Sequence, residues 1–145
     1  MFKHILVPTD GSALATKAVR AAITFAAEVG AKVTAYYAIE DISMRHAGAH
    51  LNKDLVEEFD RRTMEAAEHH VSEHVEATKA AGVSYSWLIS KVHQPHEGIV
   101  EAAQKSGCDI IFMASHGHRG LTGLIVGSVT QKVLSHSTIP VLVFR

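Results

Sequence analysis

The feature that most constrains the fold is a regular alternation between short apolar segments and longer stretches with helical periodicity. The apolar segments cover residues 3–7, 32–39, 83–89, 109–114 and 139–144. The first and the last two are nearly continuous apolar runs, which are typical of strands buried on both faces of a parallel sheet. Right-handed crossovers between such strands predict an α/β domain with a doubly wound, five-stranded parallel sheet.

Four helices are predicted between these strands. Apolar residues at helical spacing cover residues 12–29, residues 52–81, a segment after Pro95 and a segment from about Ser128. Glycines suited to the position after a helix follow the first three: Gly30, Gly82 and Gly107. Leu55 and Phe59 lie on the predicted apolar face of the long helix, and Trp87 is expected in the core.

Composition excludes several classes of partner. The formal net charge is −1, so no long-range field favours nucleic acid or an anionic membrane. No stretch approaches the roughly 20 apolar residues of a membrane span, and the apolar run that ends at Pro8 is too short for a signal peptide. Cys108 is the only cysteine, which suits a reducing compartment. We therefore expect one cytoplasmic domain over residues 1–145, without nucleic-acid binding or membrane insertion.

Ligands of doubly wound sheets bind at the carboxyl ends of the strands, where the strand order reverses. The loops expected there are residues 8–12 and residues 115–126. Four glycines fall in or beside the second loop: Gly117, Gly120, Gly123 and Gly127. Successive amides of such a loop form an anion-binding nest, and the helix that begins near Ser128 adds the positive end of its dipole.

Side chains around this loop favour a phosphate ligand. Arg119 adds positive charge, as do His116 and His118 when they are protonated. The hydroxyl of Ser128 can donate to a phosphate oxygen. Asp109 is the last acidic residue of the chain, so no later carboxylate repels a phosphate in this loop. The alternative is a glycine-rich surface loop that merely turns the chain, since glycine loops alone are weak signals.

The spacing of these residues resembles the nucleotide motif of the universal stress protein family. ATP-binding members carry Gly, two residues, Gly, nine residues, then Gly-Ser or Gly-Thr. Gly117, Gly127 and Ser128 match the last three positions, and Ala114 stands at the first. Residues 5–12 (Ile-Leu-Val-Pro-Thr-Asp-Gly-Ser) and 140–143 (Pro-Val-Leu-Val) are also similar to the family. The resemblance implies its flavodoxin-like or Rossmann-like fold, akin to the adenine-nucleotide alpha hydrolases.

The same resemblance implies a cofactor and roles for individual residues. The cofactor is ATP, with AMP or ADP as alternatives. Asp10 would contact the ribose or an Mg²⁺ ion that accompanies the nucleotide, although a cap for the first helix is the other interpretation. Pro8 and Thr9 would border the adenosine, and Ile39 would lie against the adenine. The implied nucleotide-binding residues are Pro8, Thr9, Asp10, Ile39, Met113, Ala114, His116, Gly117, Arg119, Gly120, Gly127, Ser128 and Val129.

Enzymatic turnover has less support in the sequence. There is no Walker motif, no lysine in the phosphate loop, and no second carboxylate expected at a strand end to position Mg²⁺ or water. We expect a stress-response module that binds ATP and hydrolyses it slowly at most. Two alternatives stay open: a hydrolase or adenylyl-transferring enzyme of the same α/β group, and a nucleotide-free interaction module.

A second motif needs a separate explanation. Residues 70–74 match the His-x-x-Glu-His pattern of some metalloproteases, with His70 and His74 as zinc ligands and Glu73 as the base. A polar helix face is the alternative, because no third ligand is identifiable in the sequence.

Two further expectations concern assembly. The last strand is an edge in the sheet order expected for this fold, and an apolar edge without inward charges tends to pair with another chain. We expect a homodimer through Val141–Phe144, which the resemblance also implies. Residues 40–50 lack periodicity and form a candidate lid, whose nucleotide-dependent position would alter contacts with a protein partner not yet identified.

Overall fold

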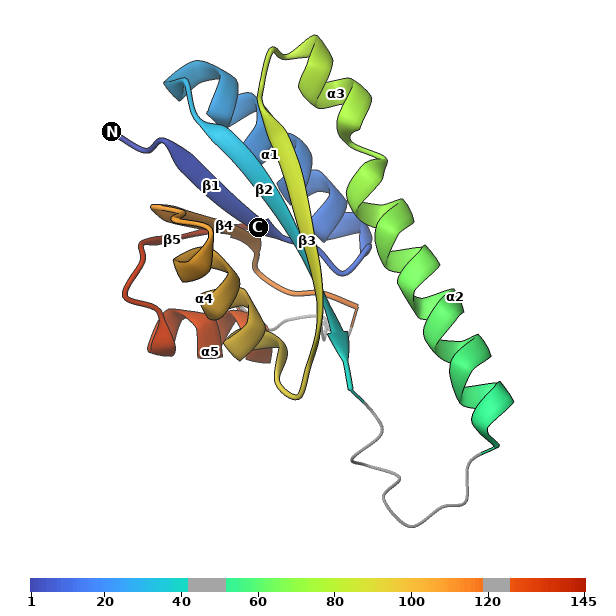
Figure 1. The fold of residues 1–145 in the computed structure, drawn as a ribbon. Coiled ribbons are helices and arrows are strands. Elements are labelled where there is room, and N and C mark those ends of the chain that lie inside the picture. Colours follow the sequence, from blue (N-terminus) through green and yellow to red (C-terminus); the bar gives the residue numbers. More distant parts are fainter. Residues whose placement is uncertain (42–51, 119–125) are drawn as a thin grey trace.

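The computed structural model describes residues 1–41, 52–118 and 126–145. Its sheet has the strand order β3-β2-β1-β4-β5, and every neighbouring pair is parallel (Figure 1). The strands are β1 (His4–Pro8), β2 (Lys32–Glu40), β3 (Tyr85–Val92), β4 (Ile110–Ala114) and β5 (Val141–Phe144). The described helices are α1 (Ala13–Val29), α2 (Lys53–Ser72), α3 (Val75–Ala80), α4 (Pro95–Lys105) and α5 (Ser128–His136). The predicted doubly wound α/β fold is confirmed.

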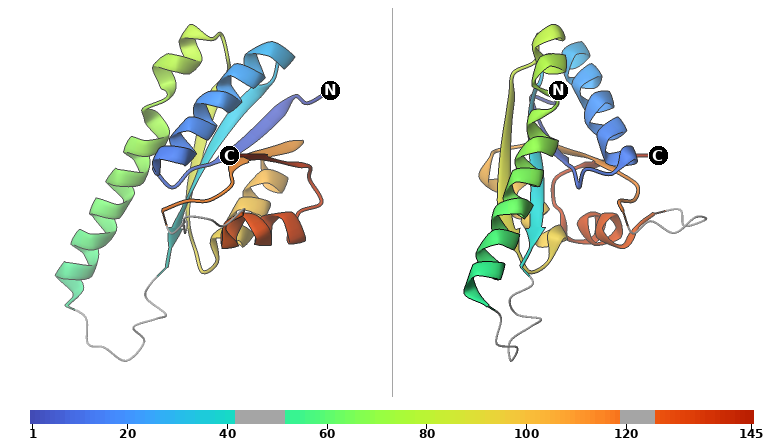
Figure 2. Two further views of the ribbon diagram at one scale, coloured as in Figure 1. Left: turned by 180° about the vertical axis from the view of Figure 1, so that it is seen from behind. Right: turned by 90° about the vertical axis from the view of Figure 1, so that its right-hand side faces the viewer.

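Helices cover both faces of the sheet, because each strand presents alternate residues to opposite sides. On one face, Val19 of α1 packs in a core with Ile5 of β1. On the other face, Ile99 of α4 and Val133 of α5 pack with Leu6 of β1. Seen from behind, α1 lies in front of the central strands (Figure 2). All residues of β1 and β4 are buried, as the continuous apolar runs predict.

The strand order places the reversal point between β1 and β4. From β1 the chain winds outward to β2 and β3, whereas β4 and β5 lie on the other side of β1. The loops that follow β1 and β4 therefore leave the sheet toward opposite faces and border an opening at its carboxyl edge. At the start of α1, the Ser12 side chain accepts a hydrogen bond from the Ala15 N–H (3.2 Å). The cap of the first helix is thus Ser12, and Asp10 is free for another role.

The prediction of one continuous helix over residues 52–81 is wrong. The chain forms α2 and then α3, and Glu73 and His74 lie at the junction. The Tyr85 hydroxyl of β3 donates to the Val71 carbonyl (2.5 Å) just before this junction and holds the end of α2 against the sheet. Although α2 has 20 residues, no helix in the described ranges combines the length and apolar character of a bilayer span.

Three apolar side chains expected to be buried are exposed instead. Leu55 is 69% exposed and Phe59 52% exposed, because the first half of α2 runs away from the sheet (Figure 1). The buried residues of α2 are Ala67 and Val71, which lie in its last turns. Trp87 is 40% exposed because β3 is an edge strand with one neighbour, a position that the sequence alone did not assign to it.

Candidate functional site

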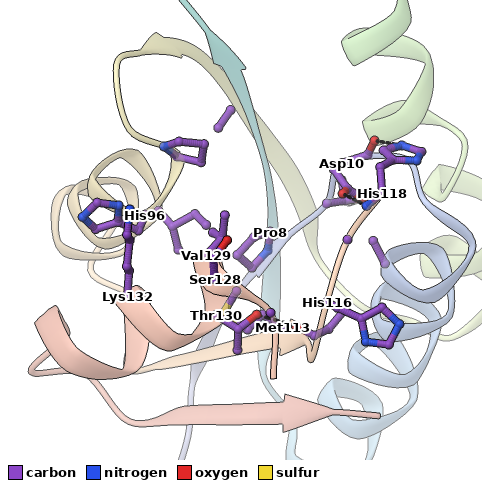
Figure 3. A pocket seen from close by; sticks show the side chains of 18 of the residues that line it. Pro8, Asp10, His96, Met113, His116, His118, Ser128, Val129, Thr130 and Lys132 are labelled. Atoms are coloured by element: carbon purple, nitrogen blue, oxygen red, sulfur yellow. Dashed lines mark hydrogen bonds between the residues drawn. The ribbon is translucent and has the colours of Figure 1, made fainter. Parts of the chain in front are cut away.

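A cavity of about 670 Å³ opens at the carboxyl edge of the sheet, beside the reversal point. Its walls come from the ends of β1, β2 and β4 and from the first turns of α4 and α5 (Figure 3). This volume lies within the range of sites for small ligands and cofactors. The cavity therefore occupies the place in the fold where a nucleotide-sized ligand is expected.

Most of the residues predicted for nucleotide binding line this cavity. They are Pro8, Thr9, Asp10, Met113, Ala114, His116, Gly117, Gly127, Ser128 and Val129. Arg119 and Gly120 lie outside the described residues, as does most of the candidate lid over 40–50. The predicted residues of the two loops therefore line one cavity at the carboxyl edge of the sheet.

Ile39, which was expected against the adenine, does not line the cavity. Its neighbours Ala38 and Glu40 do, together with Tyr36. Successive strand residues point to opposite faces, so Ile39 shares the side of β2 on which the Tyr37 ring stacks with the His70 ring of α2. Glu40 also corrects the expectation that no second carboxylate stands at a strand end.

The replacement of the family's first glycine by Ala114 is accommodated in the core. Ala114 is 7% exposed and packs in the α1-side core with Ile110 and Phe112. Its carbonyl accepts a hydrogen bond from the Thr130 hydroxyl (2.9 Å), which holds the first turn of α5 against the end of β4.

The first turn of α5 presents backbone donors to the cavity. The N–H of Gly127 donates to the Ser115 carbonyl (2.6 Å), and the Gly127 carbonyl accepts from Gln131 (2.9 Å). The N–H groups of Ser128 and Val129 are in the first helical turn, where no intrahelical acceptor exists. The Ser128 hydroxyl has no partner among the described residues. Together with the helix dipole, these groups could hold an anion at the cavity wall.

Two of the loop glycines leave little or no room for a side chain. A Cβ atom on Gly127 would lie 3.2 Å from the His116 Cα and the Ser115 carbonyl oxygen. A Cβ atom on Gly117 would overlap the carboxylate of Asp10. Because neither glycine has a positive φ, close approach explains both better than backbone freedom does.

Asp10 joins the two loops. Its Oδ1 accepts the Ser12 N–H (2.9 Å), and its Oδ2 accepts the His118 N–H (3.0 Å). The Asp10 carbonyl and His118 Nε2 are 2.8 Å apart, so the ring of His118 also contacts this loop. Burial would raise the pKa of the Asp10 carboxyl, but the hydrogen bonds from Ser12 and His118 leave it below its ordinary value.

The residues fit a nucleotide better than a preformed metal site. Both carboxylate oxygens of Asp10 already accept backbone N–H groups. The described parts of the chain contain no group of three histidine, cysteine or acidic residues that could hold a metal ion. An Mg²⁺ ion would therefore be held mainly by the phosphates of a ligand, and Asp10 would have to release a hydrogen bond to reach it.

The wall formed by α4 and α5 carries residues that sequence reasoning missed. His96 follows Pro95 in the first turn of α4, lines the cavity and is 7% exposed. Lys132 of α5 also lines the cavity, and the His136 ring lies 5.0 Å from the His96 ring. Burial lowers the pKa of His96, and His136 and Lys132 lower it further. For Lys132 the sequence did hold a signal: it follows Ser128 by four residues, so the two side chains share one face of the helix.

The His-x-x-Glu-His motif does not form a metal site within the described residues. The junction between α2 and α3 separates His70 from His74, so they do not share one helix face. His74 is 3% exposed, and its Nε2 lies 3.3 Å from a Glu73 carboxylate oxygen. The His70 ring stacks on Tyr37. His70 thus packs against β2, whereas His74 is buried at the junction of α2 and α3.

The sequence model of the universal stress protein family matches residues 1–145. The universal stress protein MJ0577 of Methanocaldococcus jannaschii is 33% identical over 157 residues, covering all of this chain and 96% of that protein. The solved structure of MJ0577 has a TM-score of 0.83 at 31% identity, over 99% of this chain and 95% of the other.

More distant solved structures share the fold. A universal stress protein in complex with cAMP has a TM-score of 0.68 at 23% identity, over 99% of this chain and 97% of that chain. A universal stress protein from Archaeoglobus fulgidus in complex with dAMP has a TM-score of 0.66 at 17% identity, over 100% and 98% of the two chains. With the whole length matched by the family and by MJ0577, this chain belongs to the universal stress protein family.

Proposed function

We propose that this chain binds an adenine nucleotide, principally ATP, and acts as a cytoplasmic, dimeric stress-response module. The observation that carries the proposal is the first turn of α5, whose unpaired N–H groups and Ser128 hydroxyl face a cavity of about 670 Å³. The start of a helix that follows a glycine-rich loop is a recurrent phosphate-binding site in α/β folds. The proposal assigns the triphosphate to Gly117, Gly127, Ser128 and Val129.

The other lining residues suit the nucleoside. Pro8, Ala38 and Met113 give apolar surface at the ends of three neighbouring strands, which is the kind of wall that a planar base contacts. Thr9 and Asp10 follow β1 and stand where a ribose would meet polar groups. Two proteins with this fold have been solved with the adenine nucleotides cAMP and dAMP, which supports an adenine ligand here.

A binding role is better supported than rapid catalysis. Both Asp10 oxygens are engaged by backbone donors. Among the described residues that line the cavity, Lys132 is the one lysine or arginine. Fast phosphoryl transfer needs a positioned water and a concentration of positive charge on the phosphates. Glu40 is the one observation that favours the alternative of slow hydrolysis, because its position at the end of β2 gives the cavity a second carboxylate.

The proposal predicts a specific complex with ATP. Native mass spectrometry of the purified protein should show one nucleotide per protomer, and calorimetric titration with ATP, with and without Mg²⁺, should give saturable binding. GTP serves as the control for the base, and phosphate release measured on the same samples should be far slower than ordinary enzymatic turnover. Protein that gives no binding heat with millimolar ATP, and carries no nucleotide after purification, would contradict the proposal.

Edge pairing through β5 predicts the effect of Val143→Asp. β5 pairs with β4 alone in the described sheet and so leaves its outer backbone groups open. Leu142 and Phe144 pack in the α1-side core and Val141 in the opposite core, whereas Val143 packs in neither. A charge at Val143 should therefore convert dimers to monomers of 15.7 kDa with little loss of folding.

Multi-angle light scattering of the wild type and of Val143→Asp checks this assembly. Val143→Thr, which keeps the shape and adds no charge, should remain dimeric. An unchanged mass for Val143→Asp would show that the subunits associate through another surface.

A further inference from the structure

The α4 wall of the cavity contains a buried polar ring without a partner. His96 is 7% exposed and makes no hydrogen bond to any residue of the described ranges. Its own backbone N–H lies in the first turn of α4, whereas the next two N–H groups, of Glu97 and Gly98, donate to the Gln94 carbonyl. In the described residues, His74 Nε2 is the only fully buried side-chain nitrogen or oxygen without a partner. The unpaired ring nitrogens of His96 are therefore not sealed off, and they keep access to the cavity that the ring lines.

Lys132 supplies a charge next to this ring. Within the residues that the structure describes, no carboxylate lies within ion-pair distance of its ammonium group. The side chain of Lys132 extends from α5 toward His96 on α4 (Figure 3). The two groups are close enough for Lys132 to lower the pKa of His96. An imidazole N–H and an ammonium group on one cavity wall can both donate to the same anion.

The position of this pair relates it to the anion site at the start of α5. Lys132 follows Ser128 by four residues, so both side chains stand on the same face of α5. The rise of four helical residues is about 6 Å along the axis. A phosphate held at Ser128 can thus continue as a chain of phosphates along this face, toward Lys132 and the ring of His96.

We infer that His96 and Lys132 form a subsite for the terminal phosphate of the bound nucleotide and make the site select triphosphates over monophosphates. The inference rests on the proposed function and extends it to the length of the phosphate chain. A neutral imidazole donates one N–H to a phosphate oxygen, and the ammonium group adds a charge-assisted hydrogen bond. Neither group would contact the single phosphate of AMP held at Ser128.

The test compares ATP with AMP on two variants, Lys132→Met and His96→Gln, by calorimetric titration. Lys132→Met should weaken ATP binding by about tenfold to 100-fold, since a hydrogen bond to a charged group contributes roughly 1.5–3 kcal/mol. AMP affinity should stay unchanged. Lys79→Met removes an exposed lysine of α3 and should leave both affinities as they are. Thermal melts confirm that His96→Gln, at a buried position, is folded.

The possible outcomes separate the two proposals. Equal weakening of ATP and AMP by Lys132→Met, or no weakening of either, would overturn the terminal-phosphate subsite while nucleotide binding still stands. Wild-type protein that binds AMP as tightly as ATP would also overturn it. Wild-type protein that binds neither nucleotide would overturn the proposed function, and the subsite with it.

Discussion

Replacing Gly127 with valine is expected to weaken ATP binding by about 100-fold or more, the loss of roughly two hydrogen bonds to a charged phosphate. The backbone of Gly127 (φ −71°, ψ 163°) is one that valine adopts readily, so the effect comes from space alone. A Cβ atom would press on the His116 backbone and the Ser115 carbonyl at 3.2 Å. The backbone at Ser115 and His116 must give way by a few tenths of an ångström, and this shift moves the donors of α5 away from their common point.

Calorimetric titration with ATP measures the loss, and circular dichroism melts show that the variant is folded. Ala77→Val is the matched control, because it adds methyl groups on an exposed position of α3. It should bind ATP like the wild type. If Gly127→Val kept its affinity, the phosphates would have to lie elsewhere in the cavity.

The sequence predicted the sheet because the signals for its central strands are local. The two runs at residues 3–7 and 109–114 form strands that are buried on both faces. Glycines mark the ends of the helices between the strands. The errors concern features that depend on tertiary structure. The strand that contains Trp87 alternates like a half-buried strand, and only its place at the edge of the sheet exposes the indole. Likewise, helical spacing continues through Glu73 and His74, where the chain turns.

The residues of the candidate site also fall into two groups: those that a local sequence pattern predicts and those whose position depends on tertiary packing. Its loop residues could be predicted because Gly117, Gly127 and Ser128 occur at a recognisable spacing within one segment. Ile39 does not line the cavity although its neighbours Ala38 and Glu40 do, because successive residues of a strand point to opposite faces. His96 and Lys132 belong to two helices, and their approach results from the packing of α4 on α5. No pattern within either helix segment indicates that these two side chains come close together.

Asp10→Ala is expected to destabilise the fold by about 1–3 kcal/mol at neutral pH, because it leaves two loop donors without an acceptor. The N–H groups of Ser12 and His118 both depend on this carboxylate. Without it, only the contact between the His118 ring and the backbone carbonyl of residue 10 still holds the loop after β4 to the loop after β1. The variant should also bind ATP weakly, since the loop that presents Gly117 is then held less firmly to the nucleoside wall.

The difference in unfolding free energy between the wild type and Asp10→Ala should depend on pH if the ionised carboxylate causes it. The pKa of Asp10 is below its ordinary value of 3.8 in the folded protein, so its contribution is fully present above that value and is lost as the pH falls through the folded pKa. Urea unfolding at a series of pH values should therefore show a constant gap between wild type and Asp10→Ala near neutrality, and a shrinking gap in acid. Glu68→Ala removes an exposed carboxylate of α2 and should track the wild type throughout. A gap that persists undiminished in strong acid would mean that Asp10 acts by packing, and that its carboxylate does not hold the two loops together.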